Sequence, residues 1–573
     1  MKSFTTPNTA LVLLGISLTS PLAFATPTLT KLHDFFVQPV TIEIQNPPPG
    51  TANPFDSAVM IGNDLWFTSQ KGGLLDVGTI SSFNLTTNAT TVQFSLSGGP
   101  DGTGPTGTPT QSGSLLYYTT VTGGSGNRGV LSAYDTVAHT NTVLWAALPG
   151  TPAVNAINPG TLQGNVAVIN RGETFGKDIY FLTANGGPGG AAAGAILRYQ
   201  TSDSSVTQVY AFGAIPDGRQ PFKGFTVVGT KLYFTTFTGG IAGTGTGNGA
   251  GSINELDVTS RGSEIYRKLA NMPLGDGSTR LPAHNPYYRA ADNSLYFTTT
   301  GTAAQPGSLQ KYDLTTNALT TLHELQDTAS GGVAFPQGKF AYGSVSEWNR
   351  ALYFTTMQGG TTNGGTINRF NLDTGTLDVL FNLTGTAGNN FGGTVRGGFT
   401  FNGSTTTPAF YLLTQKGGAN NIGTVLRLDL DPALPATPYE NWAASTSGLT
   451  GTSAVPNADP DQDGLTNSVE FAFGTSPDSG AGCTLSTATQ SAEGLEIRWT
   501  ARTDGSVNYI VAGSSTIGAA PSPWTPVSAI PAAMGSPDFV VPTGYERRHV
   551  IIPTAEAKGF FRVQATFQTG AKP

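Results

Sequence analysis

The sequence predicts an all-β protein whose main part is a seven-bladed β-propeller, and three observations lead to this prediction. A short segment rich in aromatic residues and threonine, such as ALYFTT at 351–356, recurs seven times at intervals of 51 to 63 residues. Glycine-rich loops follow most copies, and a second β-branched segment such as GTINRF at 365–370 comes next. Repeats of this length built from strands and glycine turns are typical of propeller blades, whereas helical repeats are shorter.

The seven copies align on their first aromatic residue. These residues are Trp66, Tyr117, Tyr180, Tyr233, Tyr296, Tyr353 and Tyr411. Both faces of LYFTT carry apolar or β-branched side chains, so we expect each such strand to be covered on both sides by neighbouring blades. Glycine pairs such as Gly359-Gly360 permit positive φ where the chain leaves the strand. A phosphate-binding glycine loop is the alternative, but the lysine and helix that it needs do not follow.

The N-terminal segment is predicted to complete the seventh blade. After the last repeat strand the chain runs into Pro432, Pro435 and Pro438, which cannot serve in a strand ladder. LTKLHDF, which starts at Leu29, resembles LTTLHEL, which starts at Leu319 in the outer strand of the fifth copy. We therefore expect residues 29–37 to supply the missing strand and to close a ring that spans residues 29–430.

The histidines do not form a recognisable site. His33 and His323 occupy equivalent places in the two matching strands, so we expect them to be structural. His139, His284 and His549 are scattered, and no HExxH motif or three-histidine set is present. The pattern therefore does not favour a metal hydrolase.

The repeat pattern resembles a known family. LYFTTxxGGxxxxGTIxRF, as at 352–370, is similar to the GloVer tandem repeat of bacterial exported choice-of-anchor proteins, and its glycine pair is similar to that of kelch blades. The copy at Tyr180 departs with FLT for FTT, and the copy at Tyr296 lacks the glycine pair. The resemblance implies an exported repeat protein and carries over no established activity.

Composition and charge exclude two classes of partner. Only 11% of the 573 residues are charged, the formal net charge is −7, and no run of lysine or arginine is present. Binding to nucleic acid or to an anionic membrane requires such a basic patch, so neither partner is expected. With 38% hydrophobic and 10% aromatic residues, the chain has enough apolar material for folded cores.

Residues 1–25 are predicted to be a cleaved secretory signal peptide. Lys2 precedes an apolar run that starts at Ala10, and AFA at 23–25 provides a cleavage site. An uncleaved anchor is the alternative, but the run is shorter than the ~20 residues that cross a bilayer. We therefore expect a secreted or cell-surface monomer with no membrane span in the mature chain. The single cysteine, Cys483, excludes an intramolecular disulfide and is expected to be a buried thiol.

The most specific chemistry lies beyond the repeats, in a linker predicted over 431–480 with short helices. DPDQDGLTNSVE at 459–470 matches an EF-hand-type calcium loop, with Gly464 at its sharp turn. The predicted ligands are Asp459, Asp461, Asp463, Leu465 through its carbonyl, Asn467 and Glu470. An aspartate-rich solvated turn is the alternative, but six matching positions of twelve favour calcium.

Calcium is expected to be structural and to be the one cofactor. Extracellular calcium modules bind with dissociation constants on the order of 0.1 to 1 mM, which suits constant occupancy. The stretch DPDQDGLTNSVEFAFGTSP also resembles thrombospondin type 3 and dockerin-like segments of exported bacterial proteins. A dockerin would need a second loop, which the sequence lacks, so we expect this loop to act alone.

Residues 490–573 are predicted to form a small β-sandwich. The strand-like runs are LEIRWTA, NYIVAG, WTPVSAI, RHVIIPT and GFFRVQATF, separated by turn residues. Only the closing GFFRV resembles immunoglobulin-like or fibronectin-like terminal modules.

Two functions are compatible with this organisation. The first is a non-enzymatic binding or structural protein that presents a glycine-rich propeller face to a glycan or another cell-surface component. The candidate binding residues are Tyr287, Tyr288, Trp348, Phe391 and Arg396, because aromatic rings stack on sugars and arginine binds carboxylates. Packing of these aromatic residues beneath their own loops is the alternative.

The second function is an extracellular polysaccharide hydrolase or lyase with carboxylates at the propeller centre. A hydrolase of this kind needs two carboxyl groups roughly 5 to 9.5 Å apart. The long loops offer Asp101, Glu173, Asp217, Asp276 and Glu347, none of which stands in a motif. Only analogy with other propellers supports an enzyme, so we expect no catalytic residues.

Overall fold

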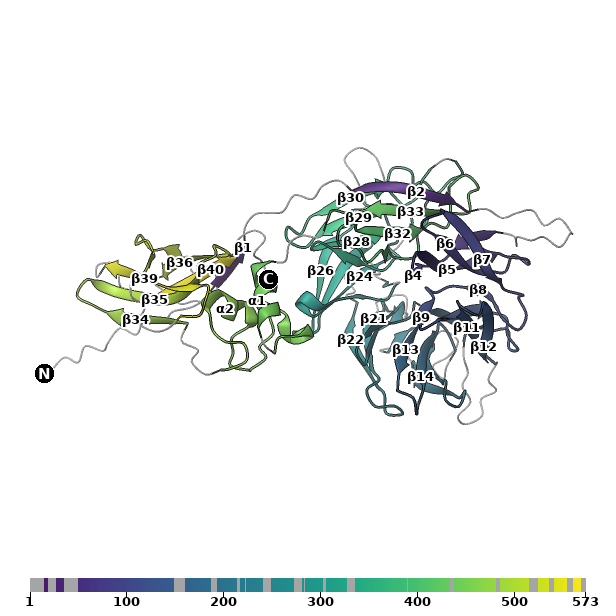
Figure 1. Cartoon of the computed structure of the whole chain (residues 1–573), viewed down its shortest axis with the longest axis horizontal. Helices are drawn as coiled ribbons and strands as arrows, with labels where there is room; N and C mark the ends of the chain where they lie inside the picture. The colour runs from purple at the N-terminus through teal and green to yellow at the C-terminus, as the bar shows by residue number, and fades with distance from the viewer. Residues whose placement is uncertain are drawn as a thin grey trace. The chain divides into compact units, whose positions relative to one another are not determined.

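The structure is a computed structural model that describes most of the chain (Figure 1). The described residues are 15–18, 27–35, 50–148, 160–186, 193–213, 217–221, 223–240, 249–272, 281–282, 284–301, 306–326, 335–388, 390–432, 437–446, 448–480, 485–514, 524–534, 541–553 and 560–567. They are mainly β-strand, with two short helices, α1 (Pro438–Ser445) and α2 (Asn467–Phe473), and the 3-10 turns η1 (Ala290–Asp292) and η2 (Gly451–Ala454). The predicted all-β class is confirmed.

The chain divides into two compact units. The repeat unit comprises Ala25–Arg289 and Ser294–Ala433. The C-terminal unit comprises Leu434–Pro573 together with Met1–Phe24 and Ala290–Asn293. The predicted signal cleavage site, as well as Cys483, lies outside the described residues. Within those residues, no helix is both long and apolar enough to cross a membrane.

The described part of the repeat unit contains seven antiparallel sheets of four or five strands, here numbered 1 to 7. Sheet 1 contains β3 (Thr51–Pro54), β4 (Val59–Ile61), β5 (Asp64–Gly72), β6 (Thr79–Asn84) and β7 (Ala89–Ser95). Sheet 2 contains β8 (Thr103–Pro105), β9 (Thr110–Ser112), β10 (Leu115–Thr122), β11 (Val130–Asp135) and β12 (Thr140–Ala146). Sheet 3 contains β13 (Leu162–Asn170), β14 (Lys177–Thr183), β15 (Ala195–Gln200) and β16 (Val206–Ala211). Sheets 4 and 5 contain β18 (Thr226–Val228), β19 (Lys231–Thr236), β21 (Ser252–Asp257) and β22 (Ile265–Asn271); and β23 (Tyr287–Arg289), β24 (Ser294–Thr299), β25 (Ser308–Asp313) and β26 (Ala318–Glu324). Sheets 6 and 7 contain β27 (Ser346–Trp348), β28 (Ala351–Thr355), β29 (Thr366–Asn371) and β30 (Leu377–Asn382); and β31 (Thr400–Phe401), β32 (Ala409–Leu413), β33 (Thr424–Asp429) and β2 (Thr28–Asp34). A further two-stranded ladder joins β17 (Gly218–Arg219) to β20 (Thr238–Gly239).

The first threonine of the repeated LYFTT segment bonds to the next sheet. The Thr355 hydroxyl donates to the carbonyl of Gly397, which precedes the first strand of sheet 7, at 3.4 Å. Four other copies repeat this bond, from Thr68 to Gly107, Thr119 to Gly164, Thr235 to His284 and Thr298 to Ala341. Where the motif has Leu182 or Leu413 instead, other polar side chains join the sheets: Asn165 bonds to the backbone of Phe225, and Thr400 to that of Ala58.

The second threonine bonds within its own sheet. The Thr356 hydroxyl accepts a hydrogen bond from the N–H of Thr366, at the start of β29, at 2.9 Å. The equivalent bonds join Thr120 to Val130, Thr183 to Ala195, Thr236 to Ser252, Thr299 to Ser308 and Thr414 to Thr424. The recurrence of these threonines is therefore explained by structural hydrogen bonds within and between the sheets. Beside them, Gly359 and Gly360 adopt φ values of 84° and 71°, as the turn requires.

Apolar side chains join the sheets in a circular order. Each sheet packs on the next through buried clusters that hold the aromatic residues of the repeats. Sheets 6 and 7 meet through Tyr353 and Phe410, whose ring centroids are 5.4 Å apart. Sheet 7 packs on sheet 1 through Phe35, Val425 and Phe67. The repeat unit is therefore β-propeller-like.

The N-terminal strand β2 is the outer strand of sheet 7. It runs antiparallel to β33, with Leu29 opposite Leu428, as the sequence predicted. A register shift occurs between Lys31 and His33. The third and fourth strands of the other six sheets show a shift in the same part of their ladder, so β2 is structurally equivalent to their outer strands.

The C-terminal unit contains two sheets and the two helices. One sheet has β34 (Ser486–Gln490), β35 (Gly494–Arg502), β39 (Tyr545–Pro553) and β38 (Ala532–Ala533); the other has β1 (Gly15–Leu18), β40 (Phe560–Phe567), β36 (Val507–Ser514) and β37 (Thr525–Pro526). Side chains of both sheets share one core, in which Trp499 and Val563 are fully buried. Phe471 of α2 belongs to the same core.

Replacing Phe35 by alanine should destabilise the repeat unit. Phe35 is fully buried beside Phe67, and it anchors the N-terminal segment where sheet 7 meets sheet 1. Truncating such a side chain costs about 3 to 5 kcal/mol of unfolding free energy. Urea unfolding followed by circular dichroism measures the loss. Val137→Ala, at a loop position that is 77% exposed, is the control and should change stability by less than about 0.5 kcal/mol. Equal stability of both variants would contradict this role of the segment.

Candidate functional site

The segments that lead into the first strands of the seven sheets lie against one another. A Cβ atom added to Gly107 would lie 2.3 Å from the backbone carbon of Gly164, and one added to Gly397 would lie 2.4 Å from the nitrogen of Ser57. These central segments therefore need glycine at their points of closest approach. Because the sheets follow one another in a circle, segments that touch their neighbours in turn enclose the centre of the repeat unit.

One side chain, that of Asp56, reaches across this centre. Asp56 belongs to sheet 1, between β3 and β4, and is 4% exposed. Its carboxylate lies 3.3 Å from the Lys223 ammonium, before sheet 4, and 3.2 Å from Nε2 of His284, before sheet 5. Sheets 4 and 5 are the ones farthest from sheet 1 in the packing order of the sheets. The three buried groups therefore join sheets that do not pack directly on one another.

The charges of this bridge depend on one another. Burial raises the pKa of Asp56, but the charges of Lys223 and His284, with the N–H of Ser57, outweigh burial and hold the pKa well below its usual range. Burial lowers the pKa of Lys223, and Asp56 offsets only part of that effect. The hydroxyl of Thr108 in sheet 2 also donates to Asp56, at 3.2 Å. Both oxygens of the carboxylate thus have a partner, Oδ2 through Lys223 and Oδ1 through Ser57, Thr108 and His284.

A half-buried cluster of aromatic and cationic groups adjoins the bridge. The ring of Phe55 has the Lys223 ammonium 5.1 Å from its centroid and the Arg396 guanidinium 5.0 Å from it. Arg396 also lies 5.4 Å from the ring of Tyr342, and its Nε donates to the side-chain oxygen of Gln415 at 3.0 Å. Cations over aromatic faces are attracted by the ring quadrupole. Two cations therefore converge beside one carboxylate.

Sequence reasoning missed Asp56, Lys223 and His284. The signal was present in the alignment of the repeats, since Asp56 and Lys223 each stand ten residues before the first aromatic residue of their copy. Gly107 and Gly343 occupy that place in two other copies. A charge at a place where two other copies have a glycine in close contact indicates a position at the centre.

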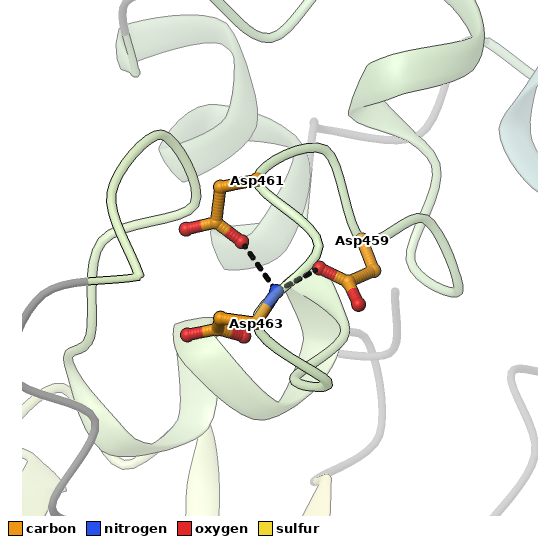
Figure 2. A group of neighbouring side chains, drawn as sticks. All are labelled: Asp459, Asp461 and Asp463. Atoms are coloured by element: carbon orange, nitrogen blue, oxygen red, sulfur yellow. Dashed lines mark hydrogen bonds between the residues drawn. The ribbon is translucent and has the colours of Figure 1, made fainter.

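The predicted calcium loop is folded as a compact cluster of carboxylates (Figure 2). Asp459, Asp461 and Asp463 each offer a carboxylate oxygen, and these oxygens lie within 4.8 Å of one another. The backbone N–H of Asp463 donates to Asp459 at 3.2 Å and to Asp461 at 3.4 Å. The N–H groups of Gly464 and Leu465 donate to Asp459 and Asp463. Backbone donors thus hold the three side chains together on one loop.

The other end of the loop holds Glu470, which is fully buried in α2. Neither of its carboxylate oxygens completes a hydrogen bond, and the nearby Thr475 hydroxyl is also left without one. Burial, together with the charges of Asp461, Asp463 and Asp459, raises the pKa of Glu470 to about 8. A buried carboxylate without a donor is costly, so this group calls for a cation.

The remaining predicted ligands have other contacts in the described structure. Asn467 is buried, and its amide nitrogen donates to the carbonyls of Ser453 and Val455 at 2.7 and 2.8 Å. These bonds fix the start of α2 on the η2 segment. The N–H of Leu465 bonds to Asp463, while its carbonyl makes no backbone bond of the loop.

Of the five acidic residues considered for a hydrolase, three accept hydrogen bonds from the scaffold, and no interaction joins any two of them among the described residues. Glu173 is exposed in a turn, and Asp276 lies outside the described residues. The others accept hydrogen bonds as follows: Asp101 from Ser97, Asp217 from Tyr210 and Tyr266, and Glu347 from Tyr287 and Arg289.

The five candidate binding residues have different surroundings, and only Arg396 lies at the central cluster. Tyr287 donates to Glu347, and Tyr288 packs against the cluster between sheets 4 and 5. The Trp348 indole donates to the carbonyl of Asp431 at 2.8 Å. Phe391 is half-buried, and its carbonyl accepts from Thr424. Three of the four aromatic residues thus have contacts within the scaffold.

Comparison with known proteins adds only distant similarities. No family model matches the chain, and no curated protein matches it in sequence. Among solved structures, it is similar to an oligogalacturonate lyase in complex with manganese (10% identity, TM-score 0.40, 73% of this chain and 99% of the other) and to a puromycin hydrolase (11%, 0.40, 90% and 67%). An auxiliary nutrient binding protein from Bacteroides thetaiotaomicron matches at 12% identity with a TM-score of 0.33, over 52% of this chain and 67% of the other. Similarities at this level carry no argument about activity.

Replacing Asp56 by asparagine should destabilise the repeat unit, because it leaves Lys223 buried without an anion. Breaking a buried ion pair from one side costs about 3 to 5 kcal/mol. Because the pKa of Asp56 is held below its ordinary value of 3.8, its stabilisation is present above that pH and is lost as the pH falls through it and below. Urea unfolding at pH 7 and at pH 3 should therefore show the gap between wild type and variant shrinking in acid.

Asp313→Asn is the matched control for this change. Asp313 accepts backbone N–H bonds in an exposed turn, and Asn84 and Asn371 make the same kind of bond in the equivalent turns of sheets 1 and 6. Its stability should stay within about 0.5 kcal/mol of wild type. A gap that is small at pH 7, or that stays constant down to pH 3, would contradict the assigned role of Asp56.

Proposed function

We propose that the seven sheets are the blades of one closed propeller and that the C-terminal sheets form a β-sandwich. The circular packing, with sheet 7 on sheet 1, supports closure of the ring. The supply of the outer strand of sheet 7 by β2 supports it as well, since both ends of the repeat region then share one sheet. The core shared by the two C-terminal sheets supports the sandwich.

We propose that the protein is an exported, non-enzymatic binding protein that presents this propeller to a glycan or another cell-surface component. The observation that carries the proposal is the engagement of Asp56. A glycosidase needs one carboxyl group as an acid and a second as a base or nucleophile. The carboxylate of Asp56 at the centre is paired with Lys223 and His284, so we assign it a structural role.

We further propose that the loop from Asp459 to Glu470 binds a structural calcium ion. The converging oxygens of Asp459, Asp461 and Asp463 would hold it. Glu470 does not belong to this converging group, but its charge interacts with all three aspartates, and we propose that it completes the site from α2. These all-oxygen donors fit Ca²⁺, and the unpartnered oxygens of Glu470 and the raised pKa of that residue support a bound cation. The ion would neutralise carboxylates that otherwise repel one another.

Calcium binding would also stabilise the C-terminal core. Phe471 follows Glu470 directly, is fully buried, and packs against the ring of Phe567 with centroids 5.9 Å apart. Its carbonyl accepts a hydrogen bond from the Tyr545 hydroxyl at 2.7 Å. A displacement of Glu470 would therefore shift Phe471 and disturb its packing in the core. The ion would act as part of this unit's fold rather than as a switch.

Calcium should raise the melting temperature of the C-terminal unit. With a dissociation constant on the order of 0.1 to 1 mM, 10 mM calcium would stabilise the folded state by about 1.4 to 2.7 kcal/mol. Calorimetric scans of the full chain, with calcium and with chelator, measure this shift. Asp461→Ala should abolish it, whereas Asp478→Ala, an exposed acid outside the loop, should keep it. An unchanged shift in Asp461→Ala would show that the ion binds elsewhere.

A glycan array should reveal binding without turnover. Incubation of the mature protein with each bound glycan, followed by chromatography of the glycan, should show no change in its length or unsaturation. Release of shorter or unsaturated products would overturn the proposal in favour of a hydrolase or lyase. Loss of those products in Asp56→Asn, with folding verified by circular dichroism, would then place the chemistry at the centre.

A further inference from the structure

The central cluster contains one charge that the protein does not balance. Lys223 is paired with Asp56 at 3.3 Å. Arg396 has no carboxylate within ion-pair distance among the described residues, and its one hydrogen bond there goes from Nε to Gln415. Its two terminal nitrogens are therefore available. Leaving His284 aside, the cluster carries one positive charge in excess.

The surroundings of Arg396 hold its guanidinium in a defined plane. Phe55 and Tyr342 lie 5.0 and 5.4 Å from its central carbon, and Gln415 fixes the inner nitrogen. Phe55, Tyr342 and Arg396 are half-buried, so they are partly accessible to a ligand, whereas the adjoining Asp56, Lys223 and His284 are buried. A planar guanidinium with two free nitrogens binds a carboxylate through two parallel hydrogen bonds.

A second group in the cluster also lacks a partner. Nδ1 of His284 is buried and makes no hydrogen bond, while its other ring nitrogen faces Asp56. Buried polar atoms are normally bonded to protein or water, so this unpartnered nitrogen can still take part in one further hydrogen bond. The cluster thus offers both an unbalanced cation and an unsatisfied polar atom from two different sheets.

We propose that Arg396, held between Phe55 and Tyr342, binds the carboxylate of an acidic saccharide at the centre of the propeller. This rests on the proposed glycan-binding function and specifies its ligand class. A single excess charge matches a carboxylate better than a phosphate, which carries nearly two. The exposed edges of the two rings would contact the sugar, as aromatic groups do in binding sites that combine apolar and polar contacts.

The test compares three probes by isothermal titration calorimetry with the full mature chain. They are a tetrasaccharide of uronic acid, the same tetrasaccharide with its carboxylates methyl-esterified, and sodium acetate. The acidic tetrasaccharide should bind at least tenfold more tightly than its ester, because a charge-assisted bond is lost on esterification. It should also bind at least tenfold more tightly than acetate, which has no sugar ring. Equal binding of acetate would overturn the saccharide assignment.

Three variants locate the site. Arg396→Gln should remove the preference for the acid over the ester, and Arg396→Lys should restore only part of it, because lysine lacks the planar fork. Arg427→Gln is the matched control, since Arg427 lies in the same sheet but is paired with Asp429 at 2.7 Å. It should keep the full preference. Melting temperatures check that all three variants are folded.

The outcomes separate the two proposals. If acid and ester bind equally and Arg396→Gln changes nothing, the inference about Arg396 is wrong while glycan binding stands. If the acid is preferred but Arg427→Gln loses the preference as Arg396→Gln does, the site lies elsewhere and the inference is again wrong. If neither tetrasaccharide binds and the glycan array is also negative, both proposals fail.

Discussion

The hydrogen bond from the first threonine of five of the seven repeats to the backbone of the next sheet, which Asn165 and Thr400 replace in the other two, is the interaction on which the repeat unit depends. Thr355 and its equivalents are buried, so each bond satisfies a carbonyl that has no strand partner at the centre. The adjacent threonine ties the third strand to the second. Where both threonines are present, the first one joins neighbouring sheets and the second one joins two strands of one sheet, which explains why the Thr-Thr pair recurs.

The same close spacing creates the candidate site. Where central segments pack this closely, a fully buried charge loses most of its hydration and needs a partner. Asp56 and Lys223 satisfy each other across the ring. Arg396 instead rests on aromatic rings and keeps two free nitrogens. The buried side of the centre is therefore paired internally, whereas Arg396 lies on its half-buried side.

The C-terminal unit also contains a buried charged residue, Glu470. Glu470 lies between a loop of three aspartates and a core that contains Phe471. The carboxylates repel one another, and the divalent cation that we propose would remove that repulsion and hold the loop closed. Burial of Glu470 then stabilises the unit, because its position connects the loop to the core.

The sequence by itself determined the all-β class, the repeat and the pairing of β2 with β33, because these follow from local periodicity and from the match of LTKLHDF with LTTLHEL. It also determined the composition of the loop at 459–470, where all donors lie within twelve residues. Only the tertiary structure decided that Asp56 meets Lys223 and His284, which lie 167 and 228 residues away. The alignment of the repeats marks Asp56 and Lys223 as equivalent positions, but only the packing of distant sheets decides that these side chains meet, because each copy faces a different partner.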